Sequence, residues 1–225
     1  MTGLPPLVLF GGTFDPVHYG HLRVAAELAT ALDVPEVRLV PAADPPHRPP
    51  PGASAADRVA MIEIAIAGCD RVGIDLCEIE RGGKSYTVDT LRALRRAAPS
   101  RALAWVVGAD AFLGLTGWHH YRELPRLAHL VVVQRPGLDL AANLRGELAS
   151  WWDVRATADH RALERAPAGS IVTVATTPHA ISATAIRATL AAVPLDRAAL
   201  EGLLPRAVLS YIESHQLYGV ATDAC

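Results

Sequence analysis

The sequence has 225 residues, a length that fits one large domain or two small ones and can bury a sizeable core. Its 21 basic and 23 acidic residues give a formal net charge of -2, so it lacks the basic excess that is typical of nucleic-acid-binding proteins. Three cysteines without a CxxC pair argue against a disulfide framework or a structural zinc site, and no apolar run approaches the roughly 18 residues of a membrane-spanning helix. We therefore expect a globular protein of the cytoplasm, with neither nucleic acid nor membrane as a partner.

The first half of the chain alternates short apolar runs with segments of helical periodicity. The apolar run over 7–10 predicts a strand buried on both faces of a parallel sheet, and the apolar spacing over 19–32 predicts the helix that follows it. The next expected segments are a strand over 37–40, a Pro-rich loop over 41–52, a helix through Ile66 capped by Ser54, an extended segment over 72–79, and a helix capped by Thr87 that ends before Pro99.

The second half continues the alternation. Its expected segments are strands over 103–107, 130–133 and 171–175, a surface excursion without clear periodicity over 139–169, a helix through Leu190 capped by Ser182, and a closing helix through His215 with Pro205 in its first turn. Strands that alternate with helices predict an α/β fold, a Rossmann-like doubly wound parallel sheet with helices on both faces. We expect a single domain over 1–225, with a small C-terminal helical part at about 182–218.

The most informative stretch, GGTFDPVHYGH, runs from Gly11 to His21 between the first strand and the first helix. Ligands of open parallel sheets bind beyond the carboxyl ends of the strands, and glycines before a helix N-terminus let backbone N–H groups approach a phosphate. His18 and His21 lie three residues apart, so on a first helical turn both imidazoles could donate to the oxygens of a phosphoryl-transfer transition state. The alternative is a tight turn followed by two exposed histidines. The absence of GxxxxGK[ST] and GxGxxG argues against a P-loop and a dinucleotide-redox site.

A second stretch, ISATAIR, ends at Arg187. Ser182 and Thr184 offer hydroxyl groups at a predicted helix start, and Arg187 follows about one turn later. Such a helix N-terminus with an arginine could hold the diphosphate part of a nucleotide. The alternative is an ordinary capped helix with a surface arginine.

Together the two stretches resemble the bacterial nicotinate-nucleotide adenylyltransferases, a family of HxGH nucleotidyltransferases. The HxGH element alone is shared with pantetheine-phosphate adenylyltransferases, cytidylyltransferases and class I aminoacyl-tRNA synthetases, so the longer match carries the resemblance. Further matches follow in family order and extend it from about residue 7 to 218: PPHRP at 45–49, SYT at 85–87, GAD at 108–110 followed by Trp118, RPG at 135–137 and QLY at 216–218. One departure is Ala183, where the commoner family form has a second serine that could contact phosphate.

The resemblance implies an adenylyl transfer. The 5′-phosphate of nicotinate mononucleotide attacks the α-phosphorus of ATP in line and gives deamido-NAD and diphosphate, in NAD biosynthesis. Since the attacking phosphate is already ionised near pH 7, catalysis consists of alignment and charge neutralisation. The implied cofactor is Mg²⁺, bound mainly through the substrate phosphates and without protein side chains as ligands. Monomer and dimer both remain open.

The resemblance also implies residue roles, with His18 and His21 as the catalytic pair that contacts the ATP phosphates. The other implied ATP-binding residues are Gly11, Gly12, Thr13, Gly108, Asp110, Ser182, Thr184 and Arg187. The implied mononucleotide-binding residues are Phe14, His47, Arg48, Thr87, Trp118 and Arg135. Trp118 would stack on the pyridine ring and Thr87 would donate to its carboxylate; the alternatives are a core aromatic residue and a plain helix cap.

Three further points stay open. The single lysine, Lys84, lies beside the SYT match without an assigned role. His119 and His120 are adjacent, so a shared ligand is not expected because neighbouring side chains diverge. The rival functions are the same reaction on nicotinamide mononucleotide and a catalytically silent nucleotide-binding domain, although a mere binder would not need both histidines and the full second stretch.

Overall fold

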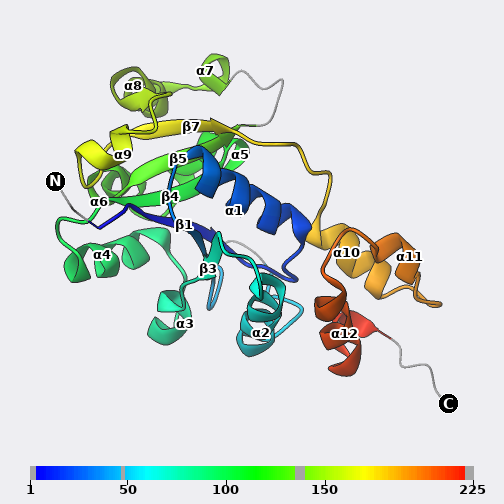
Figure 1. The fold of residues 1–225 in the computed structure, drawn as a ribbon. Coiled ribbons are helices and arrows are strands. Elements are labelled where there is room, and N and C mark those ends of the chain that lie inside the picture. The colour runs from blue at the N-terminus through cyan, green and yellow to red at the C-terminus, as the bar shows by residue number, and fades with distance from the viewer. Residues whose placement is uncertain (1–3, 47–48, 135–139, 221–225) are drawn as a thin grey trace.

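The computed structural model describes residues 4–46, 49–134 and 140–220, and within them a seven-stranded parallel sheet forms the centre (Figure 1). The strand order is β3-β2-β1-β4-β5-β7-β6, with the chain starting in the middle of the sheet and winding outward to both edges. The strands are β1 (Leu7–Gly12), β2 (Val37–Pro41), β3 (Val72–Ile74), β4 (Leu103–Gly108), β5 (His129–Gln134), β6 (Ala156–Thr157) and β7 (Ile171–Ala175). The predicted doubly wound α/β fold is confirmed.

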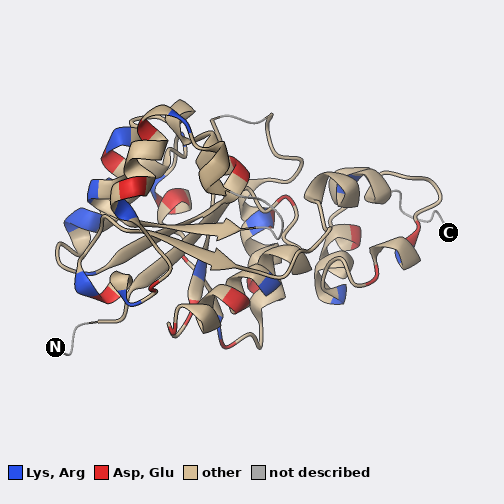
Figure 2. Ribbon diagram, turned by 90° about the horizontal axis from the view of Figure 1, so that it is seen from above, with Lys and Arg blue, Asp and Glu red and all other residues tan. Residues whose placement is uncertain are grey.

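Both faces of the sheet are covered by helices, and each face has its own hydrophobic core. Successive side chains of a strand point to opposite faces, so Val8 belongs to the core under α1 and α2 while Leu9 belongs to the core under α4. In the described strands Arg38 is the one residue with a formal charge, and the charged residues gather on the helices and loops (Figure 2). This double burial explains why the strands read as continuous apolar runs.

The helices of the described chain vary from one turn to more than three. They are α1 (Tyr19–Ala31), α2 (Ala55–Ile66), α3 (Cys77–Arg81), α4 (Thr87–Ala97), α5 (Ala109–Leu113), α6 (Leu124–Leu127), α7 (Leu140–Asn143), α8 (Gly146–Arg155), α9 (Ala162–Arg165), α10 (Ala183–Leu190), α11 (Arg197–Leu200) and α12 (Arg206–Ser214). Short 3₁₀ turns are η1 (Leu115–Gly117), η2 (Tyr121–Glu123) and η3 (Leu217–Gly219). Within the described residues, none of these helices is long and apolar enough to cross a membrane.

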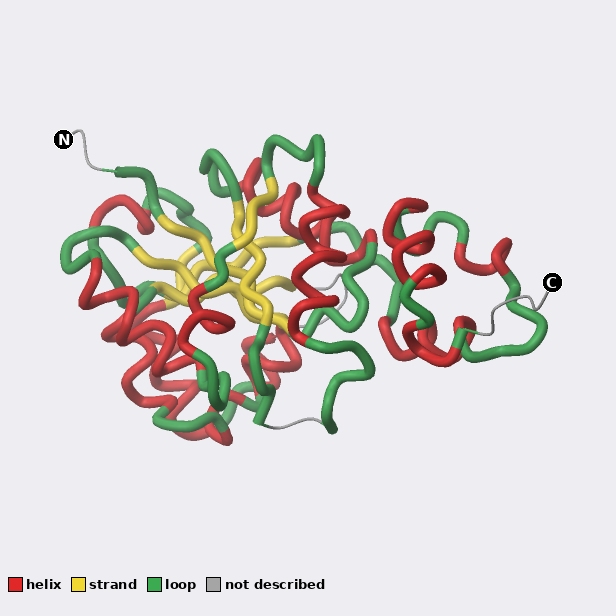
Figure 3. The backbone as a smooth tube through the Cα atoms, turned by 90° about the horizontal axis from the view of Figure 1, so that it is seen from below, coloured by secondary structure: helices red, strands yellow, loops and turns green. Residues whose placement is uncertain are grey.

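The C-terminal helices α10, α11 and α12 lie to one side of the sheet, beyond α1 and α2 (Figures 1 and 3). α12 packs against α2, and the hydroxyl of Tyr211 donates to Oδ1 of Asp57 over 3.0 Å. Ile186 and Ile212 are fully buried in the same core as the α1 face of the sheet. The C-terminal helical part is therefore joined to the sheet by a continuous apolar core.

Two of the predicted helix caps are confirmed, and one predicted strand is half wrong. The side chains of Ser54 and Ser182 accept from the first turns of α2 and α10. The extended segment over 72–79 ends as a strand at Ile74, because Oδ1 of Asp75 accepts from the backbone N–H of Cys77 and turns the chain into α3. The closing helix begins at Arg206, directly after Pro205.

The segment over 139–169 is more structured than a surface excursion. Its described part contains three short helices and the edge strand β6, which pairs with β7. Leu140, Leu144 and Leu148 are buried in the core under α4. The helical apolar spacing was obscured because Leu140 lies in α7, Leu144 in the link after it and Leu148 in α8, so no single helix contains all three.

The buried side chain of His129, in β5, bonds to the backbone of the loop between α9 and β7. Nε2 of His129 lies 2.8 Å from the carbonyl oxygen of Ala166, and its Nδ1 lies 3.1 Å from the backbone N of Ser170. Nε2 therefore donates and Nδ1 accepts, which assigns the neutral tautomer from its partners. Burial lowers the pKa of His129, and the charge of Arg95 acts in the same direction.

Acid should destabilise the fold through this residue, since the pKa of His129 is lower in the folded than in the unfolded chain. Its contribution is complete above the ordinary histidine pKa of about 6.5 and is lost as the pH falls below that value. We expect His129→Gln to be less stable at pH 8 but to lose less unfolding free energy between pH 7 and pH 5, by up to about 1.4 kcal/mol per pH unit. Urea unfolding of both proteins measures this, and equal slopes would contradict it.

Candidate functional site

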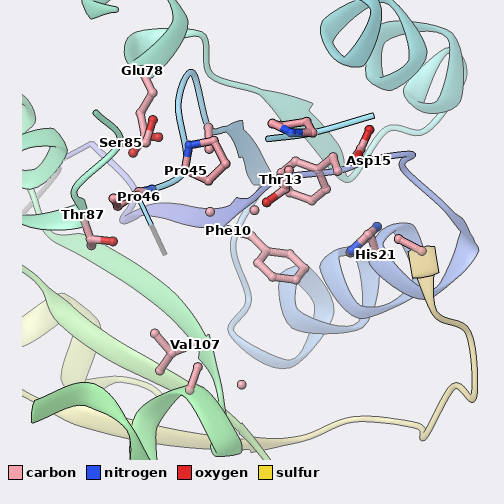
Figure 4. A pocket seen from close by; sticks show the side chains of 18 of the residues that line it. Phe10, Thr13, Asp15, His21, Pro45, Pro46, Glu78, Ser85, Thr87 and Val107 are labelled. Carbon is pink, nitrogen blue, oxygen red and sulfur yellow. The ribbon is translucent and has the colours of Figure 1, made fainter. Parts of the chain in front are cut away.

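A cavity of about 1090 Å³ opens at the carboxyl ends of β1 and β4, the edge where open parallel sheets bind their ligands. Its lining comes from distant parts of the sequence: the loop from β1 to α1, the Pro-rich loop after β2, the turn before α4, the end of β4 and the start of α10. Figure 4 shows Glu78, Ser85 and Thr87 on one side of this cavity and Asp15 and His21 on the other.

The two histidines of the first motif lie together at the start of α1. The rings of His18 and His21 are stacked, with centroids 3.7 Å apart and planes within 18°. The expectation that they share a face is confirmed, and His18 is buried rather than exposed. Gly20 makes this placement possible, because a Cβ there would lie 3.0 Å from Cε1 and Nδ1 of His18.

The buried position of His18 decides its charge. Burial lowers its pKa to about 4, so the imidazole is neutral at pH 7. A neutral ring offers one N–H donor and avoids placing two positive charges in stacked rings. His18 is thus suited to donate a hydrogen bond to a phosphate oxygen rather than to contribute a fixed charge.

The glycine turn and the residues after it line the cavity as predicted. Gly11, Gly12, Thr13 and Phe14 all belong to the lining. Phe14 is buried at a φ of 51°, and its ring meets His21 edge-on with centroids 4.9 Å apart. Phe14 therefore supports the ring of His21, and its predicted contact to the mononucleotide stays a prediction.

Asp15 is a central residue of the site that sequence reasoning missed. Its carboxylate is buried and accepts from the backbone N–H groups of Gly52 and Ala53, over 2.8 and 3.1 Å. It also accepts from the hydroxyl of Tyr218 over 2.8 Å and lies 3.7 Å from Nη1 of Arg187. The loop before α2 and the C-terminal part of the chain are thus both attached to the histidine loop.

Arg58 is a second residue that sequence reasoning missed. It is fully buried, and its guanidinium donates to the carbonyl oxygen of Thr13 over 2.8 Å and to that of Ala43 over 3.4 Å. Burial lowers the pKa of Arg58, and the charge of Asp15 opposes this. The signal was in the sequence, because residue 58 stands at helical spacing with Met61 and Ile62 on the apolar face of α2.

The second motif reaches the same cavity. Ser182, Thr184 and Arg187 all line it, at the N-terminal end of α10. Nη1 of Arg187 donates to the carbonyl oxygen of Asp15 over 2.6 Å, and its Nη2 lies 3.5 Å from Oγ1 of Thr184. Arg187 is therefore held at the cavity wall and is more than a surface arginine.

The opposite end of the cavity contains the predicted pyridine-binding residues. Trp118 lines it and also packs against the core under α4. Thr87 lines it too, but it is not the helix cap: α4 starts at Thr87 after Tyr86, without a side-chain cap. Uncapped N–H groups at a helix start favour an anion such as a carboxylate.

Two further residues at this end were not predicted. The buried Glu78 lines the cavity, and its Oε1 accepts from the hydroxyl of Thr90 over 2.6 Å. His119 lines the cavity and its ring packs at a tilt of 35° against that of Tyr86, with centroids 4.3 Å apart. Since α3 replaced the expected strand, Glu78 could not be placed from the sequence pattern.

The remaining expectations divide into three groups. Gly108 lines the cavity, whereas Asp110 is exposed in the first turn of α5, outside the lining residues. His120 pairs with Glu123 at 3.6 Å while His119 lines the cavity. The expected divergence of their side chains is wrong, because the two rings meet edge-on with centroids 4.2 Å apart and His120 has a φ of 48°. The predicted residues His47, Arg48 and Arg135 lie outside the described residues.

Lys84 now has a partner. Its Nζ lies 2.8 Å from Oδ2 of Asp44, and both side chains are more than half exposed. The same two residues form a parallel β-bridge between the Pro-rich loop and the turn before α4. Lys84 therefore ties two loops together and is not among the residues that line the cavity.

Comparisons with known proteins agree with the resemblance found in the sequence. The cytidylyltransferase-like family model matches residues 9–189. The probable nicotinate-nucleotide adenylyltransferase of Dechloromonas aromatica (strain RCB) is 48% identical over 215 residues, covering 95% of this chain and 97% of the relative. The protein of the same name from Pseudomonas aeruginosa (strain UCBPP-PA14) is 47% identical over 213 residues, covering 93% and 95%.

The fold is shared with solved structures of lower sequence identity. Plasmodium falciparum nicotinic acid mononucleotide adenylyltransferase complexed with NaAD has a TM-score of 0.72 at 16% identity, covering 97% of this chain and 99% of that one. The same protein complexed with APC has a TM-score of 0.70 at 15% identity, with the same coverage. The architecture is thus common to chains that share few residues.

The charge state of His18 can be tested directly. We expect its imidazole resonances to titrate near pH 4 in the substrate-free protein, because burial lowers its pKa, whereas an unperturbed histidine titrates near pH 6.5. NMR of the ring protons across pH 3.5 to 8 measures this, with His18→Gln to assign the signals. A His18 midpoint near 6.5 would show that the ring is solvated and charged at mildly acid pH.

Proposed function

The chain belongs to the nicotinate-nucleotide adenylyltransferase family, and we propose that the cavity at the carboxyl edge of its sheet carries out that family's reaction. The enzyme transfers AMP from ATP to nicotinate mononucleotide and produces deamido-NAD and diphosphate, in NAD biosynthesis. One observation carries the site assignment: the histidine pair and Arg187, which lie far apart in the sequence, line the same cavity.

The attacking group belongs to the substrate. The 5′-phosphate of the mononucleotide is ionised at neutral pH and attacks the α-phosphorus of ATP in line, and diphosphate leaves with the electron pair of the broken P–O bond. The protein needs no nucleophile or general base, and it contributes alignment and hydrogen-bond donors. His18 and His21 donate to phosphate oxygens on which charge increases in the transition state.

The leaving diphosphate is bound on the α10 side of the cavity. Ser182 and Thr184 provide hydroxyl groups, and the start of α10 provides a favourable partial charge. Arg187 contributes the formal positive charge that a diphosphate requires. The missing hydroxyl at Ala183 leaves the backbone of the first turn to make the corresponding contact.

The adenosine of ATP is bound beside the end of β4, and the pyridine ring of the mononucleotide is bound beside the start of α4. Gly108 and Asp110 take the adenosine, with the exposed carboxylate accepting from ribose hydroxyls. Trp118 stacks on the pyridine ring of the substrate. The carboxylate on that ring meets Thr87 and the uncapped first turn of α4. His47, Arg48 and Arg135 remain predicted contacts of the mononucleotide, alongside Phe14.

The cofactor we propose is Mg²⁺, held mainly by substrate phosphates and water. The donor set of the cavity fits an ion that arrives with ATP, because the two buried carboxylates in its lining, Asp15 and Glu78, already accept hydrogen bonds from the protein. In the described part of the chain no group of three or more His, Cys, Asp or Glu side chains is placed to hold a metal ion. When bound, Mg²⁺ neutralises charge on the phosphates. A cytoplasmic location and a monomeric or dimeric state stay predictions.

The function is tested by diphosphate release with ATP and Mg²⁺. We expect turnover with nicotinate mononucleotide, less with nicotinamide mononucleotide and none with phosphopantetheine. His21→Ala should lower kcat by about 10²- to 10³-fold, as removal of a transition-state donor does. Absence of turnover with both pyridine mononucleotides, together with calorimetric binding of ATP, would favour a silent nucleotide-binding domain instead.

The preference for the acid over the amide is tested at Thr87. Thr87→Val removes a donor to the substrate carboxylate and should lower the ratio of kcat/KM for the acid over the amide by about 10- to 100-fold, within the roughly 10⁴-fold available to such a site. Thr30→Val, at a threonine whose hydroxyl only bonds within α1, is the matched control. An equal loss for both substrates would show that Thr87 does not select between them.

A further inference from the structure

The buried carboxylate of Asp15 connects a cavity-lining arginine to the last described turn of the chain. Its Oδ1 accepts from Tyr218, in η3, and its Oδ2 faces Arg187. We propose that Tyr218 is a positioning residue, which sets the place of the Arg187 guanidinium through Asp15 and thereby tunes the affinity for ATP. This inference rests on the proposed function, in which Arg187 holds the leaving diphosphate.

Tyr218 contacts the site with its ring as well as its hydroxyl group. The hydroxyl donates to Oδ1 of Asp15 over 2.8 Å. The ring lies against Gly52, where a Cβ would come within 3.0 Å of Cδ1 of Tyr218 and 3.7 Å of Cδ of Arg187. Gly52 itself donates to Oδ2 of the same carboxylate over 2.8 Å. Tyr218, the loop at Gly52 and Arg187 therefore all contact the carboxylate of Asp15.

The carboxylate accepts three hydrogen bonds, two at Oδ1 and one at Oδ2. Oδ1 accepts from Ala53 and Tyr218, and Oδ2 accepts from Gly52. Arg187 can therefore stay 3.7 Å from Oδ2, with its firm 2.6 Å bond directed to the backbone carbonyl oxygen of Asp15. The guanidinium is held beside the carboxylate without being fully neutralised by it.

Loss of the tyrosine hydroxyl would leave the carboxylate with two of its three donors. A buried carboxylate that loses a donor must recover it from a neighbour, since an unsatisfied buried charge is costly. The cation Arg58 is already engaged with the carbonyl oxygens of Thr13 and Ala43. Arg187 is the partly exposed cation at the carboxylate, so we expect it to move toward Asp15 and away from the diphosphate.

The local conformation of Tyr218 agrees with a positioning role. Its φ is 59°, in the left-handed region that a bulky residue adopts at a cost in free energy. Burial, followed by the charge of Asp15, raises the pKa of its hydroxyl above the ordinary range, so the group remains a donor at any physiological pH. The chain holds this tyrosine in place against its backbone preference.

The experiment compares two tyrosines. We expect Tyr218→Phe to weaken ATP binding about five- to tenfold, because the guanidinium of Arg187 moves away from the diphosphate without being lost, while KM for nicotinate mononucleotide changes less than twofold. Tyr211→Phe is the matched control, because its hydroxyl also ties the C-terminal helices to α2 but reaches Asp57 instead of Asp15. It should leave the Kd for ATP at the wild-type value.

A double-mutant cycle separates positioning from plain structural support. In an Arg187→Ala background, Tyr218→Phe should have no further effect on the Kd for ATP, because the residue through which it acts is gone. An additive loss, or an equal loss with Tyr211→Phe, would overturn the proposal. Thermal unfolding of each variant shows whether the C-terminal part stays folded.

Measuring ATP binding by calorimetry keeps this inference apart from the proposed function. If the wild type binds ATP but fails to turn over with pyridine mononucleotides, the proposed function is wrong while the cycle still decides the role of Tyr218. If the wild type turns over and the cycle is additive, the function stands and Tyr218 is not a positioning residue.

Discussion

The carboxylate of Asp15 is the group on which the arrangement of the whole site depends. It is only 6% exposed, and it is satisfied by donors from the loop before α2 and from the C-terminal turn. A buried carboxylate that lost these donors would cost on the order of several kcal/mol, so the segments that supply them must meet at this point. Since Asp15 stands between the glycine turn and His18, its partners also determine where α1 begins relative to α2 and α10. The cavity is therefore shaped by one acid whose partners lie up to 203 positions away in the sequence.

Among the described residues around Asp15, few offer a free positive charge, although both proposed substrates are phosphorylated. His18 is neutral because it is buried, and the guanidinium of Arg58 already donates to two carbonyl oxygens. Arg187 is shared with Asp15. Neutral donors bind a ground-state phosphate less strongly than cations do, but they gain as charge develops on the oxygens they face. In the proposed function, this arrangement would favour the transition state over tight binding of ATP.

The sequence allowed the fold and many of the residues that line the cavity to be predicted, because those signals are local. Apolar runs marked the central strands, and Ser54 and Ser182 stood three residues before the amides that they cap. Asp15 was contained in the quoted motif, yet its role depends on partners at least 37 residues away, which no spacing rule reaches. Glu78 was lost because an Asp-induced turn replaced the second half of a strand with α3. Local signals identified side chains that line the cavity, whereas long-range contacts determine how those side chains are held.

The glycines of the first motif illustrate this division. Their pattern was interpreted as room for a phosphate to approach the backbone, but aromatic rings of the protein already use that room. Gly11 lies under the ring of Trp105, a Cβ on Gly12 would come within 2.9 Å of the Phe14 ring, and Gly20 accommodates His18. Each ring in turn borders the cavity, and Phe14 supports His21 edge-on. A methyl group at any of these positions would shift an aromatic ring that borders the cavity, so the motif determines the packing of His18 and His21 as well as the shape of the cavity.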